Sequence, residues 1–172
     1  MEERTGRFRG LCAFFSRRAR LRQKIARMKE LMEKPELSLR ERRERDKVVE
    51  WLGKKGGWEG NALLKAWATS GDVAMRPDPD ILGRAIARQG GDSAHLHEIA
   101  HLSVDSELDF NSRYYFTRLL AAECMALAER GMAIDPRKSI TYFICYGAEK
   151  MLRFMEKAEP ELVREFEKKR SI

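Results

Sequence analysis

Residues 97–101 read His-Glu-Ile-Ala-His, the HExxH pattern that zinc peptidases carry on a helix. Residues four apart lie on one helix face, so His97 and His101 could both hold one Zn²⁺ while Glu98 acts as general base. Glu123 follows at a distance along the chain at which such enzymes often place a third, carboxylate ligand. The pattern therefore permits a zinc metallopeptidase-like protein as an alternative.

The rest of the sequence argues against that alternative. Zinc peptidases generally hold their substrate along an edge strand, and no stretch of this chain alternates apolar and polar residues as a half-buried strand does. The polar face of a packed helix accounts for the same residues. We therefore expect no catalytic residue, no bound metal and no cofactor, and we predict that the protein is not an enzyme.

Positive charge is concentrated at the N-terminal end of the chain. The formal net charge of the 172 residues is +7, and residues 1–29 alone carry ten Lys or Arg against Glu2 and Glu3. That end therefore carries +8 and the remainder −1. Such one-sided charge favours binding to a phosphate backbone, with a solvated helix face or a helix lying on a membrane surface as alternatives.

Arginines of this segment and of two later helices are the candidate contacts to nucleic acid. Phenylalanines lie among the N-terminal ones, and aromatic rings can stack on bases. The later arginines could continue the same basic surface. The candidate nucleic-acid-binding residues are Arg17, Arg18, Arg20, Arg22, Arg84, Arg88 and Arg118.

Apolar residues at helical spacing account for most of the chain and predict an all-α fold, a helical bundle of about seven to eight helices with no sheet. Residues 1–10 are expected to be a flexible or partner-ordered arm. The predicted helices cover about 11–34, 38–55, 61–69, 80–89, 95–104, 109–130, 136–155 and 161–170.

Local signals set the predicted helix ends. Ser38 and Glu41 form a capping box, Asp92 or Ser93 caps the fifth helix, and Gly131 closes the sixth. Asp135 followed by Pro136 begins the seventh. The stretch 71–79, with two prolines, is the best candidate for a linker between a basic N-terminal helical region, 1–76, and a C-terminal helical bundle, 77–172.

Cysteine usage and hydropathy point to the cytoplasm. Cys12, Cys124 and Cys145 are odd in number, lack CxxC spacing and lie in apolar helical contexts, so we expect reduced, buried thiols. The longest apolar runs are far shorter than the ~20 residues of a membrane span. We therefore expect no membrane partner.

The segment from Asp80 to Tyr146 combines several motifs in a characteristic order. These are Leu82-Gly83-Arg84-Ala85-Ile86-Ala87, a short helix ending near Asp105, Arg118-Leu119-Leu120 in the long helix, and Gly131-Met132-Ala133-Ile134-Asp135 before the next helix. This order resembles the small-subunit family of the type I-E CRISPR Cascade surveillance complex, over about the C-terminal half of the chain. None of the motifs is catalytic.

The resemblance implies a non-catalytic small subunit of a ribonucleoprotein complex in antiviral defence. Subunits of this family sit as a pair along the inner face of the complex, which implies as partners the CRISPR backbone and large subunits, the guide RNA, the target DNA and a second copy of this chain. Their implied role is to stabilise the hybrid of guide RNA and target DNA, and the displaced strand, by sequence-independent contacts to the backbone.

Residues 48–88 leave a further alternative. A helix, a Gly-Gly break and a second helix can form a helix-turn-helix unit that reads duplex DNA in the major groove. The second helix lacks the polar side chains expected for base reading, so a DNA-binding regulator is the runner-up. Trp51, Trp58 and Trp67, all in this region, are expected in the core or at a subunit interface.

Overall fold

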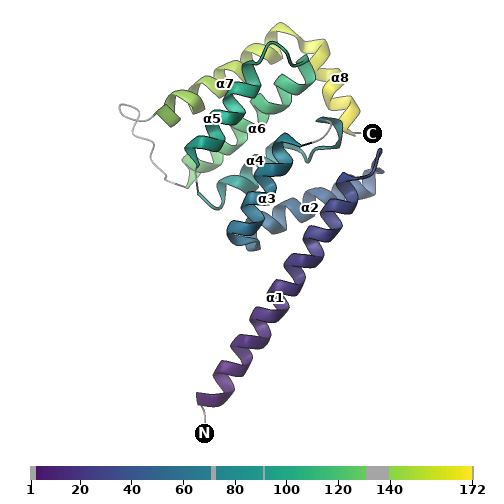
Figure 1. The fold of residues 1–172 in the computed structure, drawn as a ribbon. Helices are drawn as coiled ribbons and strands as arrows, with labels where there is room; N and C mark the ends of the chain where they lie inside the picture. The colour runs from purple at the N-terminus through teal and green to yellow at the C-terminus, as the bar shows by residue number, and fades with distance from the viewer. Residues whose placement is uncertain (1–2, 71–72, 91, 131–139, 172) are drawn as a thin grey trace.

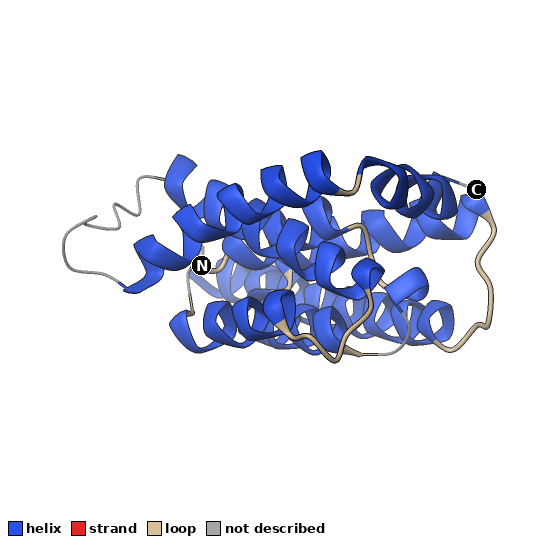
Figure 2. Ribbon diagram, turned by 90° about the horizontal axis from the view of Figure 1, so that it is seen from above, coloured by secondary structure: helices blue, strands red, loops and turns tan. Residues whose placement is uncertain are grey.

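A computed structural model describes residues 3–70, 73–90, 92–130 and 140–171; it describes the backbone alone at 3–15, 17, 74, 140–143 and 171. Within these residues the regular secondary structure is helical, and there is no strand (Figures 1 and 2). The predicted all-α fold class is confirmed. The elements are α1 (Glu3–Met32), α2 (Leu39–Lys55), α3 (Gly57–Thr69), the 3₁₀ turn η1 (Val73–Met75), α4 (Pro79–Ala87), α5 (Ser93–Val104), α6 (Phe110–Glu129), α7 (Ile140–Ala158) and α8 (Pro160–Ser171).

Side-chain caps begin several of these helices where the sequence predicts them. The Ser38 backbone N–H donates to the Glu41 carboxylate over 3.0 Å, which completes the capping box of α2. Hydrogen bonds from Lys34 and Ser38 lower the pKa of Glu41 to about 2. Asp92 accepts from the backbone of Ala94 at the start of α5. The predicted signals at Gly131 and at Asp135-Pro136 lie outside the described residues.

Helix α6 is the centre of the bundle and packs against α4, α5 and α7 (Figure 1). Eleven of its residues are buried, among them Tyr114 and Tyr115. The hydrophobic cluster around α6 also includes Val48 and Leu64 from the N-terminal half of the chain. The division into two regions at 76 and 77 stays a prediction, but apolar packing continues across that boundary.

The motif at 82–85 has a packing role at three of its four positions. Leu82 is fully buried. A Cβ built on Gly83 would lie 2.6 Å from the carbonyl oxygen of Leu119 in α6, and one built on Gly53 in α2 would lie 2.8 Å from Ala85. Helix α4 therefore crosses both neighbours at van der Waals contact of their backbones, and Arg84 alone points out of the motif into solvent.

The segment between α3 and α4 is held against the bundle by buried polar side chains. The Tyr115 hydroxyl donates to the carbonyl oxygen of Pro77 over 3.1 Å, and burial raises the pKa of Tyr115 so that the proton remains on the oxygen. Arg45 of α2 donates to the carbonyl of Met75 over 2.7 Å. Arg170 of α8 donates to the carbonyl of Arg76 over 3.2 Å. The predicted linker is thus tied to α2, α6 and α8.

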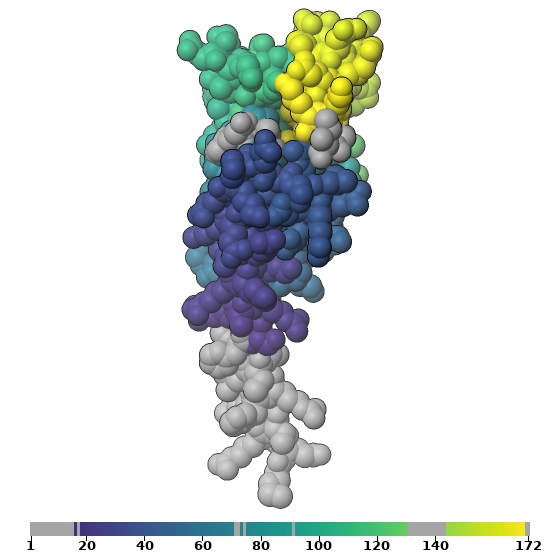
Figure 3. Space-filling view, turned by 90° about the vertical axis from the view of Figure 1, so that its right-hand side faces the viewer, coloured from purple at the N-terminus to yellow at the C-terminus, as the bar shows by residue number. Residues whose placement is uncertain are grey.

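Helix α1 begins at Glu3, so the predicted start near residue 11 is wrong and residues 3–10 continue the helix. The expectation that a partner orders this arm stays a prediction. Among the described side chains of α1, those of Leu21, Met28 and Leu31 are buried. Arg27 joins α1 to α2 by two hydrogen bonds of 2.8 Å to Glu44. The N-terminal part of α1 runs away from the bundle (Figure 1). In Figure 3 the coloured part of α1 (purple) lies toward the opposite end of the molecule from α8 (yellow).

Candidate nucleic-acid interface

Three of the four predicted arginines of α1 are exposed and have no described carboxylate partner. They are Arg18, Arg20 and Arg22; the side chain of Arg17 lies outside the described ones. Residues 16–29 contain no acidic residue at all. The buried face of α1 rests on α2, so these cations remain available to an external polyanion.

Arg84 of α4 and Arg88, the C-cap residue that follows it, are likewise exposed. Arg84 lines a shallow pocket of about 200 Å³ together with Arg118, Asp80 and Glu129. That pocket carries both signs of charge. Arg84 and Arg88 together therefore offer fewer uncompensated cations than α1 does.

Arg118 differs from the other predicted contacts because its charge is already balanced. Its guanidinium binds Asp80 of α4 and Glu167 of α8, and the side chain is 15% exposed. Burial disfavours the charge, but the hydrogen bond to Asp80 and both carboxylates outweigh this and raise the pKa of Arg118. The Cζ atom of Arg118 lies 5.9 Å from the centre of the Tyr114 ring. This geometry gives Arg118 a role in joining three helices.

The residues of the HExxH motif are not brought together with Glu123. His97 is half-buried and His101 and Glu98 are exposed on the outer side of α5, whereas Glu123 is fully buried on α6. Within the described residues, no three His, Cys, Asp or Glu side chains are placed to hold a metal ion. The third ligand that the zinc alternative requires therefore faces elsewhere.

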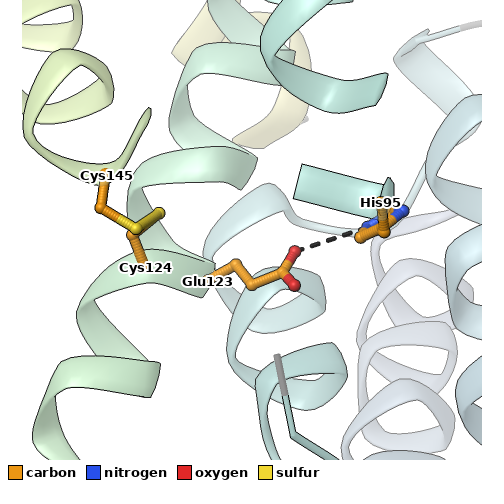
Figure 4. Close-up of a disulfide and its surroundings, with 4 residues drawn as sticks. All are labelled: His95, Glu123, Cys124 and Cys145. Carbon is orange, nitrogen blue, oxygen red and sulfur yellow. Dashed lines mark ion pairs between the residues drawn. A yellow bond between two sulfur atoms is a disulfide. The ribbon is translucent and has the colours of Figure 1, made fainter. Parts of the chain in front are cut away.

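Glu123 faces His95 instead (Figure 4). The Nε2 atom of His95 lies 3.4 Å from Oε2 of Glu123, and both side chains are at most 3% exposed. No hydrogen bond satisfies either carboxylate oxygen of Glu123 among the described residues. The sequence did carry a signal for this pair, because Glu123 interrupts the apolar stripe of α6 and His95 precedes the buried Ile99 by one turn.

Cys124 and Cys145 form a disulfide between α6 and α7, so the expectation of reduced thiols is wrong for these two (Figure 4). Their Cα atoms are 5.2 Å apart. The side chain of Cys12 is not among the described ones. Two successive residues of α6 therefore contact different helices: Glu123 lies beside His95 of α5, and Cys124 is bonded to Cys145 of α7.

The tryptophans differ in their surroundings. Trp67 is buried, as predicted, and Trp51 is half-buried. Trp58, at the start of α3, is 79% exposed and therefore lies outside the core. Its predicted place at a subunit interface stays a prediction. The helix-turn-helix alternative requires α3 to present side chains that read bases. Its exposed positions also include Ala62 and Ala66, whose methyl groups cannot form hydrogen bonds to base edges.

Comparison of the chain with protein-family models, with curated proteins and with solved structures finds no match. None of the described helices is long and apolar enough to cross a membrane.

Proposed function

We propose that this protein is a non-catalytic helical subunit that binds nucleic acid by its phosphate backbone, as the small subunit of a CRISPR ribonucleoprotein surveillance complex does. The observation that carries the binding is the exposure of three arginines on α1, Arg18, Arg20 and Arg22, within residues 16–29, which contain no carboxylate. Each phosphate that these cations neutralise releases counterions, so affinity depends on salt and not on sequence.

The wider role rests on the resemblance of residues 80–146. Gly83 and Ala85 hold α4 against α6 and α2, which leaves Arg84 as the residue of that motif free to contact a partner. In this proposal Arg84 and Arg88 extend the contact surface, and Arg118 keeps α4, α6 and α8 in place. The partners are then guide RNA, target DNA, the backbone and large subunits and a second copy of the chain.

Fluorescence anisotropy across a salt series tests the proposal. The probes are labelled single-stranded DNA, single-stranded RNA, an RNA–DNA hybrid and duplex DNA, each in two unrelated sequences. We expect sequence-tolerant binding whose logarithmic affinity falls linearly with the logarithm of salt concentration. Absence of binding at low salt overturns the proposal, preference for one duplex sequence favours the regulator alternative, and stoichiometric zinc in the purified protein favours the peptidase.

A charge-matched pair of variants locates the surface. Arg20→Glu/Arg22→Glu should lower affinity at low salt by about tenfold or more and reduce the salt slope by about 1 to 2. Lys157→Glu/Arg164→Glu changes exposed cations of α7 and α8 by the same amount of charge and should have a much smaller effect. Equal effects of the two variants would show that net charge, and not α1, determines binding.

A further inference from the structure

A pocket lies where α1 passes the junction of α2 and α3. Its volume is about 330 Å³, and the described side chains that line it are Arg18, Leu21, Lys55, Gly56, Gly57, Trp58 and Glu59. The aromatic side chain among these is Trp58, 79% exposed. Two cations and one carboxylate accompany it.

The backbone of the junction places the indole at the surface. Gly57 has φ +61°, a conformation that other residues adopt only with strain, and it begins α3 directly after α2 ends. A Cβ on Gly56 would lie 2.6 Å from the carbonyl oxygen of Leu52, so the turn is as tight as the backbone allows. Trp58 follows at once, on the side of α3 that the core does not cover.

The neighbours of Trp58 on α3 leave its ring accessible. Ala62 and Ala66 follow at four-residue intervals along the same face, and both are exposed. Their methyl side chains are too short to cover the indole. Leaving most of a large aromatic side chain in water forgoes the stabilisation that its burial would give, so an exposed Trp beside cations is a candidate contact for a ligand.

We propose that Trp58 is a stacking platform for an unpaired base of single-stranded nucleic acid, with Arg18 and Lys55 contacting the flanking phosphates. The inference rests on the proposed function and gives its α1 surface a base-contacting position. Indole rings stack on any base, because every base has a π face, so this contact is tolerant of sequence. Arg18 lines the pocket, and Arg22, four residues further on, shares its face of α1 and is exposed, so a strand that leaves the pocket can meet a second cation there.

This geometry distinguishes single strands from duplexes. In a duplex the bases are already stacked and paired, so the indole can gain contact only by disrupting them. Trp58 should therefore contribute to binding of single-stranded DNA and single-stranded RNA and contribute little to binding of duplex DNA.

The test measures affinity and salt slope for oligothymidylate, oligouridylate and duplex DNA with the full chain. Trp58→Ala should weaken single-strand binding about five- to a hundredfold and leave the salt slope unchanged, because stacking releases no counterions. Arg18→Gln should reduce the slope by about 1. Phe154→Ala removes another exposed aromatic, 67% exposed on α7, and should leave binding as in the wild type.

Two further variants separate stacking from general damage. Trp58→Phe keeps an aromatic face and should retain most of the affinity, and Glu59→Gln removes the carboxylate from the pocket and should tighten binding. If wild type binds single strands with a steep salt slope and Trp58→Ala binds equally well, the inference fails while the proposed function stands. If wild type binds no nucleic acid, the proposed function fails and takes the inference with it.

Discussion

Gly83 of α4 and Leu119 of α6 meet through their backbones: a Cβ on Gly83 would lie 2.6 Å from the Leu119 carbonyl oxygen and 2.8 Å from the Glu123 nitrogen. Backbone atoms of a central helix cannot move aside as the end of a side chain can. We therefore predict that Gly83→Ala lowers the free energy of unfolding by about 1–3 kcal/mol, measured by urea denaturation.

Gly147→Ala in α7 is the matched control for this prediction. Among the described residues, no atom lies within 4 Å of a Cβ built there, and the position is exposed within a helix. Alanine should stabilise the protein at this site by about 0.5–1 kcal/mol, because glycine loses more backbone entropy in a helix. If Gly83→Ala were also stabilising, α4 and α6 would not cross as closely as described.

The outcome for the helices shows which parts of the fold are determined locally. The capping box at Ser38 and the cap at Asp92 depend only on residues within one turn, and both were predicted from the sequence. The predicted start of α1 near residue 11 is too late, although Gly6 and Gly10, both weak helix formers, lie within the helix. Helix propensity is a weak preference that the surrounding sequence overrides.

The site was predictable only in part, because partner choice depends on tertiary position. Helical periodicity was enough to expect exposed arginines on α1. It could not show that Arg118 reaches carboxylates on α4 and α8, 38 and 49 residues away along the chain. Nor could it show that Trp58 lies outside the core, since that depends on how α1 passes the junction of α2 and α3.

The buried pair of His95 and Glu123 makes a prediction about single and double substitutions. His95→Leu leaves the carboxyl group of Glu123 in the core without its polar neighbour and should cost about 3–5 kcal/mol of unfolding free energy. His95→Leu/Glu123→Leu removes both polar groups and should recover much of that loss. A double-mutant cycle in thermal or urea denaturation measures the coupling; costs that simply add would contradict contact between the two side chains.

The ion pair between Lys65 and Asp92 predicts a pH dependence of stability. Its atoms are 2.8 Å apart, and the hydrogen bond from Lys65 lowers the pKa of Asp92 below its usual value. A carboxyl group whose pKa is lower in the folded state stabilises that state above its unfolded pKa of about 3.9, and the contribution is lost as pH falls through the folded value. Asp92→Asn keeps a capping side chain for α5 but loses the charge.

Because Asp92 is 46% exposed, solvent screening limits the effect to about 0.5 kcal/mol. We expect Asp92→Asn to lower the free energy of unfolding by that amount at pH 7 and by progressively less below pH 4, measured by urea denaturation at each pH. In a Lys65→Met background the same substitution should cost nearly nothing. A constant difference from pH 7 to pH 2 would contradict the ion pair.

The bond between Cys124 and Cys145 closes a loop that contains the described end of α6 and the start of α7, with a sequence separation of 21 residues. Closing a loop of this length restricts the unfolded chain and should contribute about 3 kcal/mol to the free energy of unfolding.

Counting reactive thiols tests the bond. Unreduced protein should show one reactive thiol per chain in denaturant, that of Cys12, and three after reduction. Cys145→Ser should lower stability by about the same amount as reduction, and reduction should then have no further effect; Cys12→Ser is the matched control and should leave both the bond and the stability unchanged. Three reactive thiols before reduction would show that the bond does not form in the purified protein, and that α7 is held to α6 by packing alone.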